Sequence, residues 1–170
     1  MSVELTCARM FDSKRQGSPA MTIHVRPATI DDLDNLAPLF DAYRQFYGQP
    51  MDIPRAHAFL AERFARNESV VLIAMDGSRC AGFTQLYPLF SSVRTVRTYL
   101  LNDLFVAAQA RRQGVAVALL HAAAEHGRTM GVASLSLSTA HDNIPAQRLY
   151  ESLGWKRDEH FREYSLSLLD

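Results

Sequence analysis

The stretch from Leu101 to Ala123 constrains the fold most, because it reads as a strand, a short loop and a helix in direct succession. An apolar run ends at Val106, and apolar residues then recur at helical spacing from Val115 onward. Another alternating segment, residues 133–138, follows this helix. A strand reached through a helical crossover pairs parallel to the strand before it. The pattern therefore predicts an α/β chain with this unit at its centre.

The loop of this unit reads Arg-Arg-Gln-Gly-Val-Ala over residues 111–116 and opens the helix. A helix N-terminus carries unpaired N–H groups and the positive end of the helix dipole, so it can bind a phosphate. Gly114 has no Cβ and lets the backbone approach such an anion closely. An ordinary strand-to-helix turn with solvated arginines is the alternative. The loop lacks the Lys-Ser/Thr pair of a Walker motif and the glycines of a dinucleotide fingerprint.

Composition excludes several classes of protein. The 170 residues suit one domain, and 18 basic against 18 acidic side chains give zero formal charge, which argues against nucleic-acid binding. No apolar run approaches the roughly 20 residues of a transmembrane helix, so no membrane association is expected. The two cysteines, Cys7 and Cys80, show neither a disulfide framework nor metal spacing, which favours the cytoplasm and no bound metal.

The remaining segments predict an N-terminal extension over residues 1–20 and a single domain over residues 21–170. The predicted order is β-α-α-β-β-β-α-β-α-β-β, a mixed, mostly antiparallel sheet of about seven strands flanked by helices. Asp76-Gly77 indicates a hairpin turn, Gly82 a bulge or close contact, and Pro38 a break in the first helix. Strands are expected at residues 22–26, 69–75, 80–89, 96–106, 133–138, 155–156 and 161–168, and helices at 30–46, 56–66, 113–130 and 144–153.

Two motifs resemble the GNAT superfamily of N-acetyltransferases. The Arg-x-x-Gly-x-Ala loop at residues 111–116 is similar to that family's coenzyme A-binding pattern, Gln/Arg-x-x-Gly-x-Gly/Ala. Residues 143–155 resemble its Asn-x-x-Ala-x-x-Leu-Tyr-x-x-x-Gly-Phe/Trp signature in register, and Asp103 to Val106 resembles the strand before the coenzyme loop. The order of elements matches the GNAT fold over about 150 residues.

The resemblance implies an acetyl-CoA-dependent N-acetyltransferase that uses no metal. The coenzyme would lie in a wedge between the central strand and the strand after the crossover helix. The residues implied in coenzyme binding are Leu104, Phe105, Val106, Arg111, Arg112, Gln113, Gly114, Val115, Ala116, Asn143 and Tyr150.

Acetyl transfer requires donors to a developing oxyanion, a neutral amine and a proton for the leaving thiolate. A backbone N–H of Phe105 or Val106 is the candidate oxyanion donor. The resemblance makes Tyr150 the candidate general acid, whereas spacing alone favours a core tyrosine whose hydroxyl bonds to the backbone. Asp103 is the candidate base, acting through water, or else an edge carboxylate that fixes a loop. Asn143 caps its helix in either interpretation.

The acceptor is less specified. Residues 82–92 resemble a branch of the family that includes a yeast enzyme acting on histones and polyamines, and Gln85 and Tyr87 would line the acceptor channel there. A primary amine on a small molecule, polyamine or amino-acid-like, is the first expectation. A protein lysine or N-terminus, or a non-catalytic acyl-CoA-binding regulatory role, remains an alternative. That branch also implies a homodimer, formed in some members by exchange of C-terminal strands such as residues 161–168.

Overall fold

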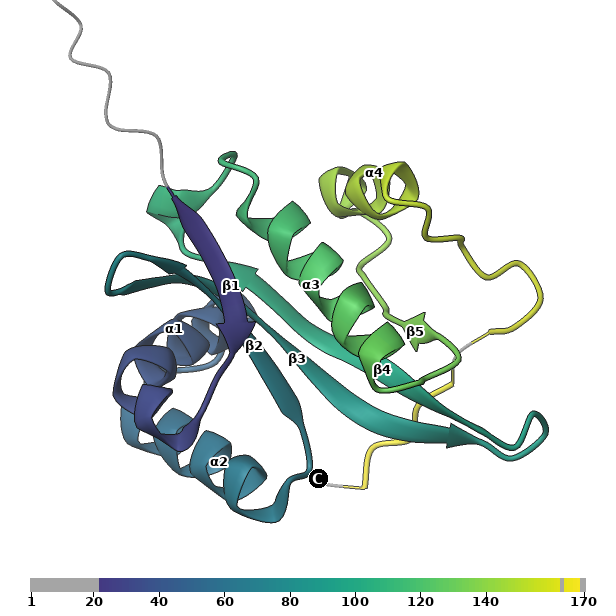
Figure 1. Ribbon diagram of the computed structural model, residues 1–170, viewed down its shortest axis with the longest axis horizontal. Helices are drawn as coiled ribbons and strands as arrows, with labels where there is room; N and C mark the ends of the chain where they lie inside the picture. The colour runs from purple at the N-terminus through teal and green to yellow at the C-terminus, as the bar shows by residue number, and fades with distance from the viewer. Residues whose placement is uncertain (1–21, 163, 169–170) are drawn as a thin grey trace, which may run out of the picture.

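The computed structural model describes residues 22–162 and 164–168. The expected extension over residues 1–20 lies outside them. The observed order matches the prediction from the first strand through the last helix (Figure 1). In chain order the elements are β1 Ile23–Pro27, the 3-10 helix η1 Ile30–Asp32, α1 Leu33–Phe46, α2 Ile53–Arg66, β2 Val70–Asp76, β3 Arg79–Ser91, β4 Val96–Val106, the 3-10 helix η2 Ala108–Ala110, α3 Val115–Thr129, β5 Leu135–Ser136 and α4 Ile144–Ser152.

The sheet has the strand order β1-β2-β3-β4-β5, in which the first four strands are antiparallel. The predicted parallel pairing after the crossover helix is confirmed, because β5 runs parallel to β4. That pairing is short and joins only Tyr99 to Leu135 and Leu100 to Ser136. In the described part of the chain, the rest of β4 toward Val106 therefore pairs with β3 alone, and its other edge is open.

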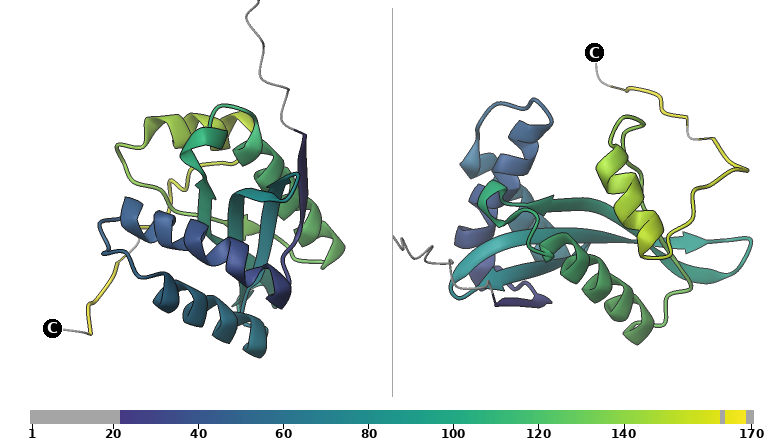
Figure 2. Two further views of the ribbon diagram at one scale, coloured as in Figure 1. Left: turned by 90° about the vertical axis from the view of Figure 1, so that its left-hand side faces the viewer. Right: turned by 90° about the horizontal axis from the view of Figure 1, so that it is seen from above.

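Helices cover both faces of the sheet (Figure 2). One core cluster packs α3 against one face, with Leu119 and Leu120 at its centre. A second cluster packs α1 and α2 against the other face, around Phe83. The helix α4 lies beyond the open edge of β4 (Figure 1). The layers thus leave the end of β4 between α1, α3 and α4.

Gly82 sets how closely α3 approaches the sheet. A Cβ added there would lie 2.9 Å from the Phe105 carbonyl oxygen and 3.0 and 3.2 Å from the side chains of Val115 and Leu119. The close contact predicted at this glycine is therefore present. Only a residue without a Cβ lets the first turns of α3 rest on β3 and β4, which places the helix N-terminus at the end of β4.

Two details of the first helical segment differ from expectation. Pro38 does not break α1, which runs through it. Proline removes the hydrogen bond to the carbonyl four residues earlier, and here Asp34 and Pro38 both lie on the exposed side, where water can solvate that carbonyl. The segment begins instead with η1, where an Asp32 carboxylate oxygen accepts a hydrogen bond from the Thr29 backbone N–H at 2.8 Å.

The sheet has five strands rather than about seven, and the prediction of two further strands after α4 was wrong for the described residues. Trp155 closes α4 instead of beginning a strand: Gly154 has φ +86°, and the Trp155 N–H donates to the Tyr150 carbonyl at 3.1 Å. The alternating apolar residues near the C-terminus are 82–88% exposed (Phe161, Tyr164, Leu166 and Leu168). Alternation shows that a segment could pair, but a strand forms only beside a partner.

Candidate active site

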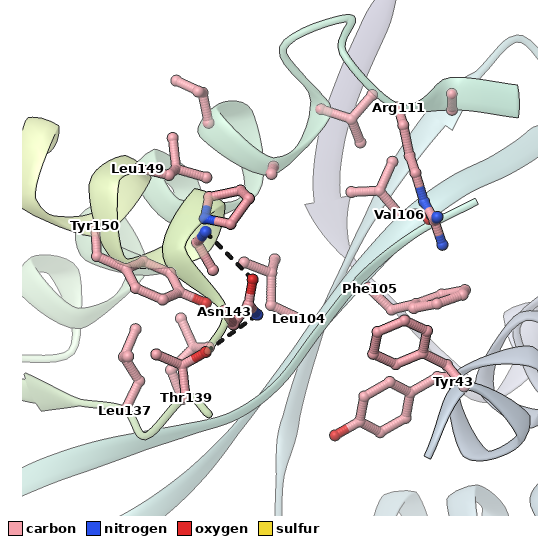
Figure 3. A pocket seen from close by; sticks show the side chains of 18 of the residues that line it. Tyr43, Leu104, Phe105, Val106, Arg111, Leu137, Thr139, Asn143, Leu149 and Tyr150 are labelled. Carbon is pink, nitrogen blue, oxygen red and sulfur yellow. Dashed lines mark hydrogen bonds between the residues drawn. The ribbon is translucent and has the colours of Figure 1, made fainter. Parts of the chain in front are cut away.

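A cavity of about 550 Å³ opens where β4 loses its second partner. Its walls come from α1, the end of β4, the loop into α3, residues 137–139 and α4 (Figure 3). The predicted wedge between the central strand and the strand after the crossover is therefore a real cavity. Most of the residues proposed from the sequence line it, namely Leu104, Phe105, Val106, Arg111, Arg112, Gly114, Val115, Ala116, Asn143 and Tyr150.

One end of the cavity is the N-terminus of α3. Gly114 is the residue before the helix and has φ +81°, and Arg112 is also left-handed at φ +62°. No side chain caps this helix, so the first-turn N–H groups of Val115, Ala116 and Val117 lack intrahelical partners and lie at the cavity wall. The helix dipole adds a partial positive charge. This end suits an anionic group.

The two arginines of the loop add full charges at the same end. Arg111 is held in place, since its Nε donates to the Val106 carbonyl at 3.2 Å and its guanidinium carbon lies 5.8 Å from the centre of the Phe105 ring. Gln113, also proposed for coenzyme binding, does not line the cavity, and its Nε2 donates to the Gln109 carbonyl at 3.1 Å.

The open edge of β4 presents backbone groups to the cavity. The Ala107 N–H donates to the Ala81 carbonyl at 2.9 Å and so points toward β3. Backbone groups of successive strand residues point to alternate sides. The N–H of Val106 therefore points to the open edge, and the N–H of Phe105 points to β3. The bond from Arg111 to the Val106 carbonyl agrees with this direction.

The helix α4 forms the opposite wall. Asn143 caps it, because its Oδ1 accepts from the Ala146 N–H at 3.4 Å and its Nδ2 donates to Thr139 Oγ1 at 3.2 Å. Tyr150 lies two turns later on the same side, and its hydroxyl points into the cavity toward Leu104 (Figure 3). A tyrosine keeps its proton at neutral pH, and burial raises the pKa of Tyr150 further.

On the α1 side, Asp103 is 5% exposed and does not itself line the cavity. Its two hydrogen-bond partners do: Tyr43 donates from its hydroxyl, and Asn102 donates from Nδ2 at 3.0 Å. Burial raises the pKa of Asp103, and these two hydrogen bonds oppose the rise. A carboxylate with a raised pKa accepts a proton more readily than an exposed one.

The two residues expected at the acceptor channel lie behind this wall. Gln85 is fully buried, and Tyr87 is partly buried beside it. Gln85 Nε2 donates to the Tyr87 hydroxyl at 2.6 Å and to Ser69 Oγ at 3.1 Å. Burial, together with the charge of Asp103, raises the pKa of Tyr87 to about 12. Neither side chain reaches the cavity wall directly.

An aromatic wall of the cavity comes from α1. The helical spacing of Tyr43, Phe46 and Tyr47 favours core positions over a pocket wall, but all three line the cavity with Phe105. Tyr43 and Tyr47 meet edge to face at 5.2 Å between ring centres, and Tyr43 and Phe105 are 5.9 Å apart. Phe46 and Tyr47 are each 64% exposed. Only the approach of α1 to β4 distinguishes these roles.

Within residues 22–162 and 164–168, no cluster of three or more His, Cys, Asp or Glu side chains could hold a metal ion. Nor does this part of the chain contain a helix long and apolar enough to cross a bilayer.

Comparison with known proteins agrees with this geometry. The acetyltransferase (GNAT) family pattern matches residues 36–155. The chain is 44% identical over 146 residues to an uncharacterized N-acetyltransferase, YhfO, of Bacillus subtilis (strain 168), covering 86% of this chain and 98% of that protein. It is 34% identical to a probable acetyltransferase of Haemophilus influenzae (strain ATCC 51907 / DSM 11121 / KW20 / Rd), covering 81% and 92% of the two chains.

A solved structure is similar as well. The crystal structure of a probable acetyltransferase superposes with a TM-score of 0.82 at 42% identity, covering 86% of this chain and 99% of that one. The element order, the sheet with its open β4 edge and the family match over most of the domain lead to one assignment. The chain belongs to the GNAT family of acetyltransferases and is an acetyl-transfer enzyme.

Proposed function

We propose that the protein moves the acetyl group of acetyl-CoA to a primary amine of a small molecule, by direct attack of the amine on the thioester. One observation carries the proposal. A single cavity brings together the uncapped N-terminus of α3, which suits an anion, and the open edge of β4, where a backbone N–H points into free space. The protonated Tyr150 and the hydrogen-bond partners of the buried Asp103 line the same cavity. These are the groups that such a transfer requires.

The residues at the N-terminus of α3 fit a coenzyme with a pyrophosphate. The uncapped first-turn N–H groups and the left-handed Arg112 and Gly114 form a cradle of backbone donors. Arg111 and Arg112 would neutralise charge there. Asn143 would contact the coenzyme arm while it caps α4. The coenzyme supplies the acetyl thioester.

The open edge of β4 would place one donor at the reacting carbonyl oxygen. Of the two backbone groups considered from the sequence, we favour the N–H of Val106, because the N–H of Phe105 points toward β3. A preorganised donor at a developing negative charge is worth several kcal/mol in a dry site. No side chain is needed for this role.

Proton transfer would involve two side chains on opposite walls. Asp103 would take a proton from the acceptor ammonium, through water or through the Tyr43 hydroxyl at the wall, and so leave a neutral amine that can attack. Tyr150, which is protonated at neutral pH and whose hydroxyl points into the cavity, would give a proton to the leaving thiolate. Asp103 therefore starts as a charged carboxylate that can accept a proton, and Tyr150 starts as a neutral phenol that can donate one.

The acceptor we propose is a polyamine or an amino-acid-like amine. The cavity volume lies in the range of small-molecule sites, and residues 82–92 resemble the branch that includes the yeast histone and polyamine enzyme. Gln85 and Tyr87 would support the acceptor side of the cavity from behind its wall, without lining it.

Residues 21–170 would form the catalytic domain in the cytoplasm.

The exposed apolar residues of the C-terminal segment support a homodimer in which that segment packs on a second copy. Sedimentation at micromolar concentration tests this, and a monomer would refute it.

The first experiment is thermal unfolding with acetyl-CoA, CoA, ATP and NAD in parallel. A ligand at 100 times its dissociation constant adds about 2.7 kcal/mol, which raises the midpoint by several degrees. A rise with both coenzyme A forms and none with NAD is expected. Thiol release is then measured with spermidine, putrescine, free amino acids and a lysine peptide. No rise with either coenzyme A form would overturn the proposal, and turnover of the peptide alone would replace the small-molecule acceptor.

A further inference from the structure

Gln85 and Asp103 face each other across the sheet. They are direct partners in the antiparallel register of β3 and β4, next to the irregularity between Gln85 and Leu86. Side chains of directly opposed residues project from the same face, with Cβ atoms about 4.5–5.5 Å apart. The face is the one that α1 covers, because Tyr43 bonds to Asp103 there. The buried amide and the buried carboxyl are therefore neighbours.

The side-chain amide of Gln85 has one atom, Oε1, whose hydrogen-bonding capacity is not used. Its side chain is fully buried, and Nε2 uses its two hydrogens on Tyr87 and Ser69. Oε1 is buried and has no hydrogen-bond partner among the described residues. A buried acceptor without a donor is costly, and such groups usually have a reason in the function of a protein. A donor is missing at this position.

The groups around Asp103 show which donor could appear. Tyr43 from α1 and Asn102 from β4 already donate to it. From β3, Tyr87 has its hydroxyl oxygen occupied by the Gln85 amide, and Tyr87 in turn is near Arg63 and Glu68. As a carboxylate, Asp103 only accepts. Once protonated it gains one O–H donor, and its strand partner Gln85 carries the acceptor Oε1, which is buried without a hydrogen-bond partner among the described residues.

We propose that Gln85 is a positioning residue that accepts a hydrogen bond from Asp103 when Asp103 is protonated. This inference rests on the proposed role of Asp103 as the base. The acceptor ammonium gives one proton to Asp103, whose charge goes from −1 to 0 while Gln85 stays neutral. A hydrogen bond to the neutral form of a carboxyl increases its proton affinity. Gln85 thus makes Asp103 a stronger base without touching the substrate.

The test is a carboxyl ¹³C NMR titration of Asp103 in the full chain, with the resonance assigned by its loss in Asp103→Asn. In Gln85→Met, which keeps the length of the side chain and removes the amide, the proton affinity of Asp103 should fall roughly tenfold, the worth of one hydrogen bond. Thr84→Val is the control, because Thr84 is equally buried and bonds the Asp103 backbone carbonyl at 2.8 Å from the other face. It should leave the midpoint unchanged.

A second measurement needs no substitution. In the unmodified chain the side-chain amide resonances of Gln85 should shift with the same midpoint as the Asp103 carboxyl. This comparison decides the matter even if Gln85→Met fails to fold. An unchanged or raised Asp103 midpoint in Gln85→Met, or Gln85 amide resonances that do not follow Asp103, would overturn the inference.

The proposed base is tested separately. If Asp103→Asn retains full turnover of an amine identified in the thiol-release screen, Asp103 is not the base and the proposed mechanism fails. The titrations would still decide whether Gln85 bonds the protonated carboxyl. Two results in Gln85→Met would together support both the base role of Asp103 and the positioning role of Gln85. The titration midpoint of Asp103 should be lower, and the acidic limb of the pH profile of kcat/KM should move down by the same amount.

Discussion

The two ends of the cavity are built in different ways. At the proposed coenzyme end, residues 111–117 form one continuous segment, and backbone N–H groups at the start of α3 dominate the site. At the proposed acceptor end, Tyr43 of α1 lines the wall, Asp103 of β4 and Gln85 of β3 lie behind it, and side-chain groups dominate. The first end depends on local conformation. The second depends on how three elements pack.

This contrast teaches where substitutions should act. A backbone cradle is sensitive to φ and to bulk but not to the identity of most side chains. A side-chain network is sensitive to single polar atoms, because each buried donor or acceptor needs its partner. Coenzyme affinity and turnover should therefore respond to different residues.

The largest effect is expected at Asp103. Asp103→Asn keeps the size and the hydrogen bond from Tyr43 but cannot take a proton, so kcat should fall by about 10³-fold. The affinity for coenzyme A, measured by calorimetry, should stay the same. Asp76→Asn, at the β2–β3 hairpin and outside the cavity lining, is the control for removing a carboxylate. If Asp103→Asn lost both turnover and coenzyme affinity, the two ends of the cavity would not act independently.

Tyr150→Phe should lower kcat by about 10²-fold with coenzyme A binding intact, since it removes one proton donor and little packing. Stopped-time thiol release at saturating acetyl-CoA measures the loss. Ser92→Ala, at an exposed residue of the β3–β4 hairpin that does not line the cavity, is the control for deleting a hydroxyl and should have no effect. Unchanged turnover in Tyr150→Phe would make Tyr150 a packing residue only.

Gly114→Ala should weaken coenzyme A binding by about tenfold. Its φ of +81° is strained for any residue with a Cβ, by about 1–2 kcal/mol, although no atom lies within 4 Å of the added carbon. Gly131→Ala is the matched control at the other end of α3, with φ +66° and equally open space. Both variants should lose similar stability, and only Gly114→Ala should lose coenzyme affinity by calorimetry. Equal affinity in both would refute the cradle.

The smallest effect concerns stability and has opposite signs at two aspartates. The pKa of Asp103 is raised on folding by burial, so the folded chain binds more protons and loses stability as pH rises through the window above the unfolded pKa of about 3.9. Asp103→Asn should therefore raise Tm at pH 7 by a few degrees, and the gain should vanish near pH 3. Equal Tm values for Asp103→Asn and the unmodified chain at pH 7 would argue against a carboxylate that burial destabilises.

Asp32 is the counterpart. The Arg26 guanidinium, which lies 2.7 Å from its carboxylate, lowers the pKa of Asp32 to about 2. A lowered pKa contributes stability that is present above the unfolded pKa and is lost as pH falls toward 2. Asp32→Asn should therefore cost about 1 kcal/mol at pH 7, seen as a lower Tm, because solvent screens a pair whose Arg26 side chain is 38% exposed. A higher Tm in this variant would contradict the ion pair.

The local parts of the site could be predicted from the sequence. Arg111, Gly114 and Asn143 stand in short segments whose spacing already specifies a helix start, and the structure places them at the cavity. The order of elements through α4 followed from periodicity and turns in the same way. The two strands expected after α4 were wrong, because alternation reports which side chains could be buried and not whether a partner edge is present.

The family, the strand–loop–helix unit and the helix end that would hold a coenzyme follow from the sequence, because all of these depend on residues close together along the chain. That Tyr43 lines the cavity, that the Val106 N–H points to the open edge, and that Gln85, whose side-chain oxygen has no partner among the described residues, is the strand partner of Asp103 became known from the three-dimensional structure alone. These depend on strand register and on the approach of α1 to β4. Register and packing arise from contacts between distant segments, which no local pattern records.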